Sequence, residues 1–147
     1  MATKEIERKI AVIFATDVVG YSKSIEINEE KTIKSLRACK KILEDLFKEH
    51  DGRIFNTAGD SVLAEFSSAV SAVICATEFQ KLIKERNESE KNDLKMEFRI
   101  GINMGDVVVE GDNLYGDGVN IAARIEALAQ PNGCLLYTSD AADDVLW

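Results

Sequence analysis

Residues 9–20 read KIAVIFATDVVG, an apolar and largely β-branched run. Such a run, closed by a glycine, is typical of a buried strand. Asp17 stands near its end and Gly20 closes it, so we expect a carboxylate at the carboxyl end of this strand. A charged group in that place is the first candidate for chemistry, and the elements that follow determine what lies beside it.

Three amphipathic helices are expected from apolar spacings of three, four and seven residues. The first begins after Asn28 and ends near residues 51–52, and the second is capped by Ser67 or Ser68. The third runs from about residue 117 to 128 and ends before a proline. The inner face of the second helix is predicted to comprise Val70, Val73, Ile74, Phe79, Leu82 and Ile83.

Two hairpins are expected between these helices. Residues 53–66 contain two strand-like runs around Ala58-Gly59-Asp60, and residues 94–103 alternate strictly between apolar and polar side chains. A tight turn at residues 104–105 would then lead to a strand over 106–110. The order β-α-β-β-α-β-β-α predicts an α+β fold, an antiparallel sheet with helices on one face.

Length and charge narrow the function. The chain has 147 residues, about one domain, and its 18 Lys and Arg against 26 Asp and Glu give a net charge of −8. An acidic protein repels phosphate backbones, so we expect no nucleic-acid partner. No apolar run approaches the roughly 20 residues of a membrane helix, and residues 1–9 are polar, so neither a membrane span nor a secretory signal is expected.

The cysteines predict a protein of the reducing cytoplasm with free thiols. There are three of them, far apart, without any C-x-x-C motif, and His50 is the one histidine. Neither a zinc site nor a disulfide framework is therefore expected. His50 ends the first helix and is interpreted as a partly exposed helix-end residue. The cysteines are Cys39, Cys75 and Cys134.

Asp17 and Asp60 form the first candidate site. Asp60 lies at the tip of the 53–66 hairpin, and a hairpin tip can lie beside the end of a neighbouring strand. Two adjacent carboxylates repel each other unless a cation lies between them, and Mg²⁺ or Mn²⁺ is commonly held by carboxylates and substrate phosphates. The alternative is that both residues are structural: Asp17 caps a helix, and Asp60 is an ordinary turn residue of its hairpin.

Asn120 and Arg124 form the second candidate site. They are four residues apart on the third helix, so they share one face. An amide beside a guanidinium suits a ribose and a phosphate, although a solvated helix face explains the same spacing. Gly111 and Gly116 have the spacing of a P-loop, but Asp117 follows where a lysine is required, which excludes that motif.

Four segments of the chain resemble the catalytic domain of class III adenylate and guanylate cyclases, particularly the bacterial ones. They are FATDVVGYS (14–22), NTAGDSVLAEF (56–66), FRIGINMGDVVVEGD (98–112) and LYGDGVNIAARIEALAQPNG (114–133). The resemblance covers about residues 8–133, in order and at the family's spacing. It implies a ferredoxin-like, palm-like fold, and a homodimer whose sites are shared between the two subunits.

The resemblance also implies the roles of individual residues. Asp17 and Asp60 would bind two Mg²⁺ or Mn²⁺ ions, with the backbone carbonyl of Val18 as a further ligand. Asn120 would orient the ribose and Arg124 would stabilise charge on the reacting phosphate, both from the partner subunit. The remaining substrate contacts would come from Asn56, Thr57, Gly59 and Asn113. The implied reaction forms a 3′,5′-cyclic nucleotide and pyrophosphate from a purine nucleoside triphosphate.

Two positions depart from the family's pattern for base selection. Asn56 stands where adenylate cyclases usually carry lysine and guanylate cyclases glutamate, and Asn113 stands where adenylate cyclases often carry aspartate. An amide both donates and accepts hydrogen bonds, so neither base is clearly favoured by these residues. ATP is favoured by the resemblance of the surrounding segments to bacterial adenylate cyclases.

The last residues depart from the family more strongly. After Gly133 the chain reads CLLYTSDAADDVLW, without the lysine and the final hairpin that the family carries there. We therefore expect residues 1–133 to be an incomplete catalytic domain and residues 134–147 to be a non-native tail. An alternative function follows, in which a catalytically inactive cyclase-like domain binds nucleotide or dimerises.

Overall fold

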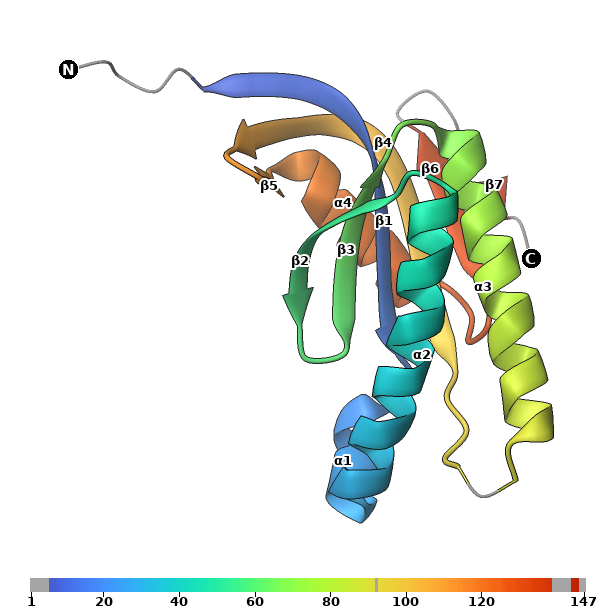
Figure 1. Cartoon of the computed structure of the whole chain (residues 1–147). Helices are drawn as coiled ribbons and strands as arrows, with labels where there is room; N and C mark the ends of the chain where they lie inside the picture. The colour runs from blue at the N-terminus through green and yellow to red at the C-terminus, as the bar shows by residue number, and fades with distance from the viewer. Residues whose placement is uncertain (1–5, 92, 139–143, 146–147) are drawn as a thin grey trace.

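A computed structural model describes residues 6–91, 93–138 and 144–145. Its strands are joined in one sheet in the order β2-β3-β1-β4-β6-β7, and β5 pairs with β4 beside this path (Figure 1). The elements are β1 (Glu7–Val18), α1 (Tyr21–Ile27), α2 (Glu29–Glu49), β2 (Arg53–Ala58), β3 (Ser61–Phe66), α3 (Ala69–Ser89), β4 (Phe98–Glu110), β5 (Asn113–Tyr115), α4 (Asp117–Leu128), β6 (Cys134–Thr138) and β7 (Asp144–Val145). The predicted α+β class is confirmed.

Strand β1 lies at the centre of the sheet, antiparallel to β3 on one side and to β4 on the other. Strand β4 is one continuous strand, so the predicted turn at residues 104–105 is wrong. Met104 and Gly105 pair with Val12 and Ala11 of β1. Since β1 is itself 12 residues long, it offers a partner along the whole length of β4 and outweighs the local turn signal.

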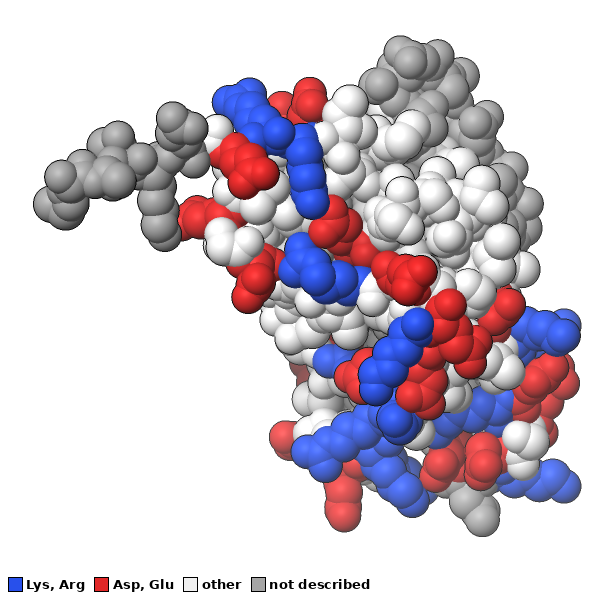
Figure 2. All heavy atoms as spheres, turned by 45° about the horizontal axis from the view of Figure 1, so that its top comes forward, with Lys and Arg blue, Asp and Glu red and all other residues white. Residues whose placement is uncertain are grey.

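Charged side chains lie on the outside of the sheet and helices. Figure 2 shows described acidic and basic side chains side by side over much of one face. Several form ion pairs across strands: Glu65 of β3 accepts from Lys9 Nζ at 2.7 Å and from Arg53 Nη2 at 3.0 Å. Exposed pairs of this kind stabilise a fold only weakly.

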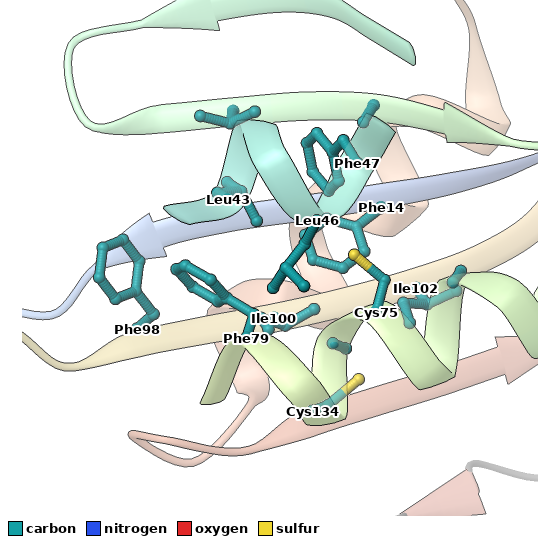
Figure 3. Close-up of a cluster of buried hydrophobic side chains, with 14 of the residues drawn as sticks. Phe14, Leu43, Leu46, Phe47, Cys75, Phe79, Phe98, Ile100, Ile102 and Cys134 are labelled. Atoms are coloured by element: carbon teal, nitrogen blue, oxygen red, sulfur yellow. The ribbon is translucent and has the colours of Figure 1, made fainter. Parts of the chain in front are cut away.

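One face of the sheet is covered by α2 and α3, which lie in front of it in Figure 1. Their core is aromatic: Phe14 of β1 meets Phe47 of α2 edge to face, with ring centroids 5.2 Å apart, and Phe79 of α3 meets Phe98 of β4 in the same way at 5.0 Å (Figure 3). Edge-to-face contacts of this kind add to the stability that the rings gain from burial alone.

Helix α4 packs on the opposite face, so the prediction of helices on one face is wrong for this helix. Ala11, Ile13 and Ala15 of β1 point away from the aromatic core and pack with Val119 and Ala122 of α4. The physical reason lies in β1, whose side chains are apolar on both faces. A strand buried on both faces needs a covering element on each.

The helix caps are confirmed, but the predicted inner face of α3 is wrong in part. Asn28 accepts a hydrogen bond from Lys31 N, and Ser68 accepts one from Ser71 N. Of the predicted face, Val70, Ile74 and Leu82 are exposed, and α3 continues to residue 89. Small side chains let α3 approach the sheet, and its buried residues are Ala72, Cys75, Ala76, Phe79, Gln80 and Ile83. Helix α1 was not predicted.

Backbone contacts hold α4 against β4. A Cβ on Gly101 of β4 would meet the backbone nitrogen of Glu126 and, at 2.7 Å, the carbonyl oxygen of Ala122. A Cβ on Gly118 of α4 would meet the carbonyl oxygen of Asp106 at 2.5 Å. Buried Asn103 adds a hydrogen bond from its Nδ2 to the Gly118 carbonyl at 2.9 Å.

Residues beyond the predicted boundary at 133 are part of the sheet. Residues 134–138 form β6, which pairs parallel with β4, and β7 pairs with β6. Cys134 is buried in the aromatic core, so the first residue of the predicted tail contributes to folding. Within the described residues, no helix is long and apolar enough to span a bilayer.

Replacing Gly101 by alanine tests the contact between α4 and β4. We expect Gly101→Ala to lower the free energy of unfolding by about 1–3 kcal/mol, the usual cost of overpacking. This loss outweighs the higher strand propensity of alanine compared with glycine. Gly105→Ala on the same strand is the control, since its Cβ would first meet a side-chain atom, Asn103 Nδ2, at 3.1 Å. Urea unfolding of both variants measures the difference; equal losses would contradict the proposed contact.

Candidate functional site

The carboxylates of the first candidate site converge at the end of β1. Asp17 is the penultimate residue of β1, and Asp60 follows Gly59 in the turn between β2 and β3. Asp60 Oδ2 accepts a hydrogen bond from the backbone nitrogen of Val18 at 2.9 Å. The prediction that the hairpin tip lies beside the strand end is thereby confirmed, and Figure 1 shows both at the same end of the sheet.

The tight turn at Gly59 holds Asp60 in place. Gly59 has φ +59°, in the left-handed region that favours glycine. Its carbonyl oxygen accepts a hydrogen bond from Lys40 Nζ of α2 at 2.9 Å. The turn is therefore fastened to α2 on one side and, through Asp60, to β1 on the other.

Arg99 of β4 holds the carboxylate of Asp17, and this residue was missed from the sequence. Its Nε and Nη2 donate to Asp17 Oδ1 at 3.3 Å, and Nη2 also donates to Oδ2 at 3.2 Å. Its Nη1 donates to the carbonyl oxygen of Ala127 in the turn of chain that ends α4. The strict alternation of residues 94–103 placed Arg99 among the polar side chains, but only the register of β1 with β4 sets it opposite Asp17.

Glu126 of α4 lies buried beside these charges and was also missed. Burial, a hydrogen bond with Asp17 and the negative charges of Asp17 and Asp60 raise its pKa to about 8, against the opposing effect of Arg99. These effects favour the protonated form of Glu126. No sequence pattern distinguishes it from an ordinary helix glutamate.

A depression of about 330 Å³ opens over this group of side chains. Its walls come from three strands and from α4, and its lining residues are Ala15, Asp17, Ser61, Leu63, Arg99, Ala123, Glu126 and Ala127. A larger depression of about 590 Å³ lies between α3 and the approach to β4, around Lys81, Lys84 and Lys95, and contains none of the predicted site residues. We therefore place the site where the carboxylates converge.

The donor set fits Mg²⁺ or Mn²⁺. Both cations prefer oxygen ligands, and Asp17 and Asp60 offer carboxylate oxygens on either side of Val18. Burial raises the pKa of Glu126 most, and the hydrogen bond and negative charge of Asp17 and the charge of Asp60 raise it further. A divalent cation would relieve that repulsion.

Asn120 and Arg124 lie apart from the carboxylates in this chain. Both are exposed on α4 and share one face of it, as their spacing predicts, but neither lines the depression. The neighbouring stripe of α4, with Ala123 and Ala127, lines it instead. The structure therefore brings Asp17 and Asp60 together and leaves Asn120 and Arg124 on an open surface.

The remaining substrate-contact candidates are exposed or nearly so. Asn56 and Thr57 lie on β2, where the register with β3 shifts between Ile54 and Asn56 as in a β-bulge. Asn113 begins β5 and donates through Nδ2 to the Tyr115 hydroxyl at 3.0 Å. A hydrogen bond from Arg53 Nη1 to the Asp112 carbonyl joins β2 to the turn before β5. The two base-selection candidates thus belong to neighbouring elements.

Comparison with known proteins gives one consistent family. The family model described as the adenylate and guanylate cyclase catalytic domain matches residues 2–142. A putative adenylate cyclase 3 of Rhizobium meliloti is 48% identical over 134 residues, which cover 90% of this chain and 23% of that protein. An adenylate cyclase of Streptomyces coelicolor is 30% identical, over 94% of this chain and 35% of its own length. The chain thus spans about a quarter to a third of these relatives.

Solved structures agree with the sequence relatives. The adenylate/guanylate cyclase/hydrolase from Silicibacter pomeroyi superposes with a TM-score of 0.81 at 34% identity, over 90% of this chain and 77% of that one. The guanylyl cyclase Cya2 superposes with a TM-score of 0.79 at 25% identity, over 90% of this chain and 77% of that one. The adenylyl cyclase CyaB from P. aeruginosa has the same fold, with a TM-score of 0.77 at 23% identity. The superposition covers 90% of this chain and 79% of that one.

Removing the Arg99 guanidinium tests the electrostatic balance around Asp17. We expect Arg99→Gln to lower the free energy of unfolding by about 1–3 kcal/mol without divalent cations, since Asp17 loses hydrogen bonds from a charged donor. Lys41→Gln is the control, because its ion pair with Asp45 is exposed on α2 and is expected to contribute under about 1 kcal/mol. Urea unfolding at neutral pH with a chelator compares the two; equal losses would show that Arg99 is merely a surface charge.

Proposed function

The chain belongs to the adenylate and guanylate cyclase catalytic domain family, and we propose that it converts ATP to 3′,5′-cyclic AMP and pyrophosphate. The observation that carries this proposal is the convergence of Asp17 and Asp60 at Val18, beside an open depression. The two bacterial relatives are named adenylate cyclases, which supports ATP over GTP. The activity of the whole protein is part of the same proposal, because the chain spans only a fraction of those relatives.

In the proposed mechanism, Asp17, Asp60 and the Val18 carbonyl hold two Mg²⁺ or Mn²⁺ ions. When bound there, the ions would supply Lewis-acid activation of the ribose 3′-hydroxyl and positive charge for the triphosphate. Asp17 also accepts the hydroxyl proton as the 3′-oxygen attacks the α-phosphate and pyrophosphate leaves. Arg99 supports this step by holding the Asp17 carboxylate toward the depression.

Asn120 and Arg124 act on substrate bound by a second copy of the chain in this proposal. Their exposure on α4, away from the carboxylates, supports it, because groups on an open helix face are available to a partner. Arg124 would stabilise the charge that develops on the reacting phosphate, and Asn120 would orient the ribose. The active form would then be a homodimer with two shared sites.

In the same proposal, Asn56 and Asn113 select the base, and Thr57 and Gly59 make further contacts with the substrate. Both amides lie on neighbouring elements joined by the Arg53 to Asp112 hydrogen bond. Each can present a donor or an acceptor to the purine edge. Recognition of adenine by two amides would then depend on how each amide is turned.

A product assay with matched variants tests the proposed function. The protein is incubated with Mn²⁺ and ATP, GTP, CTP or UTP separately, and products are identified by mass spectrometry. We expect cyclic AMP from ATP. A folded protein that binds nucleotide and forms no cyclic product would favour the alternative of an inactive, nucleotide-binding or dimerising domain.

Asp60→Asn removes a proposed ligand charge while leaving an oxygen that accepts from Val18 N. We expect an activity loss of about 100- to 1,000-fold, comparable to removing one electrostatic group from an active site, and weaker Mn²⁺ binding. Asp45→Asn is the control, since Asp45 is an exposed α2 residue paired with Lys41. Product formation and Mn²⁺ titration by calorimetry measure both effects; unchanged Mn²⁺ affinity would remove Asp60 from the proposed ligands.

Asn56→Lys tests base selection. Lysine restores the residue that adenylate cyclases usually carry, so kcat/KM for ATP relative to GTP should rise about tenfold, a typical contribution of one specific contact. Thr77→Lys adds the same charge on the exposed face of α3 and should leave the ratio unchanged. If the ratio does not rise, Asn56 does not select the base.

A further inference from the structure

A second group of metal-ligating side chains lies between α2 and α3. Glu49 and His50 end α2, and Glu78 faces them from α3. His50 Nε2 lies 3.2 Å from Glu78 Oε2, and one ligand atom from each of the three residues lies within 4.8 Å of the others. Figure 1 shows this end of α2 at the opposite end of the helix from α1, which follows the strand that carries Asp17.

The spacing of these atoms suits a small cation. Zinc bonds to a histidine nitrogen and a carboxylate oxygen at about 2.0–2.2 Å, and two tetrahedral ligands are then about 3.4 Å apart. The 3.2 Å separation of His50 Nε2 and Glu78 Oε2 is nearly that distance. Glu49 is exposed, so its side chain can rotate to bring the third oxygen closer.

The charges of the group also favour a cation. Glu49 and Glu78 place two carboxylates close together, and close carboxylates repel each other unless a positive group lies between them. Glu49 moreover lies at the carboxyl end of α2, where the helix dipole disfavours negative charge. Within the described residues, no Lys or Arg pairs with either carboxylate, and His50 is the only partner of Glu78.

We propose that Glu49, His50 and Glu78 bind one divalent transition-metal cation, with Zn²⁺ the best fit, which joins α2 to α3. The cation replaces the hydrogen bond between His50 Nε2 and Glu78 Oε2: the neutral imidazole binds through Nε2 with its hydrogen on Nδ1, and any further proton goes to solvent. An imidazole with two carboxylates prefers such a cation over Mg²⁺, which favours oxygen ligands alone. The sequence predicted no zinc site because it has no C-x-x-C motif and only one histidine; the two carboxylates come from different helices, with Glu78 lying 28 residues from His50.

Zinc titration in excess Mg²⁺ tests the proposal, because Mg²⁺ occupies the oxygen ligands of Asp17 and Asp60. Calorimetry with Zn²⁺ should show one bound ion per chain in the unmodified protein and in Asp17→Asn. His50→Gln and Glu78→Gln should each weaken it at least about tenfold, the effect that even outer-shell substitutions produce. Glu85→Gln, an exposed carboxylate on the same helix, is the matched control and should bind as the unmodified protein does.

Thermal unfolding gives a second measurement that is independent of activity. Zn²⁺ should raise the Tm of the unmodified protein and of Glu85→Gln, because it binds the folded state. At the same zinc concentration it should raise the Tm of His50→Gln by less, because the weaker site is less occupied; the folding of this variant is checked by circular dichroism without zinc. Absence of zinc binding in excess Mg²⁺ would overturn the proposal, and so would a zinc affinity in His50→Gln and Glu78→Gln equal to that of the unmodified protein.

Discussion

The backbone contact between α4 and β4 is the constraint on which the site depends. Gly101 and Gly118 leave no space for side chains between the helix and the strand, so α4 lies directly on the sheet. That position brings Glu126 and the Ala127 carbonyl to Arg99 and Asp17. It also makes α4 the fourth wall of the depression, while the neighbouring stripe of the same helix, with Asn120 and Arg124, is exposed. Protein interiors adjust poorly to added volume, so even one methyl group here would displace several functional groups.

The charges at the site are balanced in a way that leaves room for a cation. Glu126 is hydrogen-bonded to Asp17, the negative charge of Asp60 also acts on it, and one guanidinium, that of Arg99, opposes these charges. Burial of Glu126 beside Asp17 favours its protonated form, which reduces this imbalance. Arg99 in turn is shared between Asp17 and a helix carbonyl, so it holds the carboxylate without enclosing it. The depression therefore combines carboxylate oxygens held in place with negative charge that Arg99 only partly neutralises.

The sequence predicted the elements that depend only on residues close together in the chain. The buried run at 9–20, the 53–66 hairpin and the Asn28 and Ser68 caps needed only neighbouring residues, and the meeting of Asp17 with Asp60 followed from them. Features that depend on strand register or on helix placement were missed. Arg99 faces Asp17 only through pairing between residues 82 apart. Helix α3 buries small residues in preference to larger ones, which apolar periodicity does not anticipate.

The β-bulge in β2 has a consequence for how copies of this chain associate. Strand β2 is at one edge of the sheet, and an edge strand offers unpaired backbone groups to other chains. The register shift between Ile54 and Asn56 breaks the regular row of these groups, and Arg53 adds charge beside it. Strand-by-strand extension of the sheet from this edge is thereby disfavoured. At this edge, contacts between copies therefore depend on side chains more than on backbone hydrogen bonds.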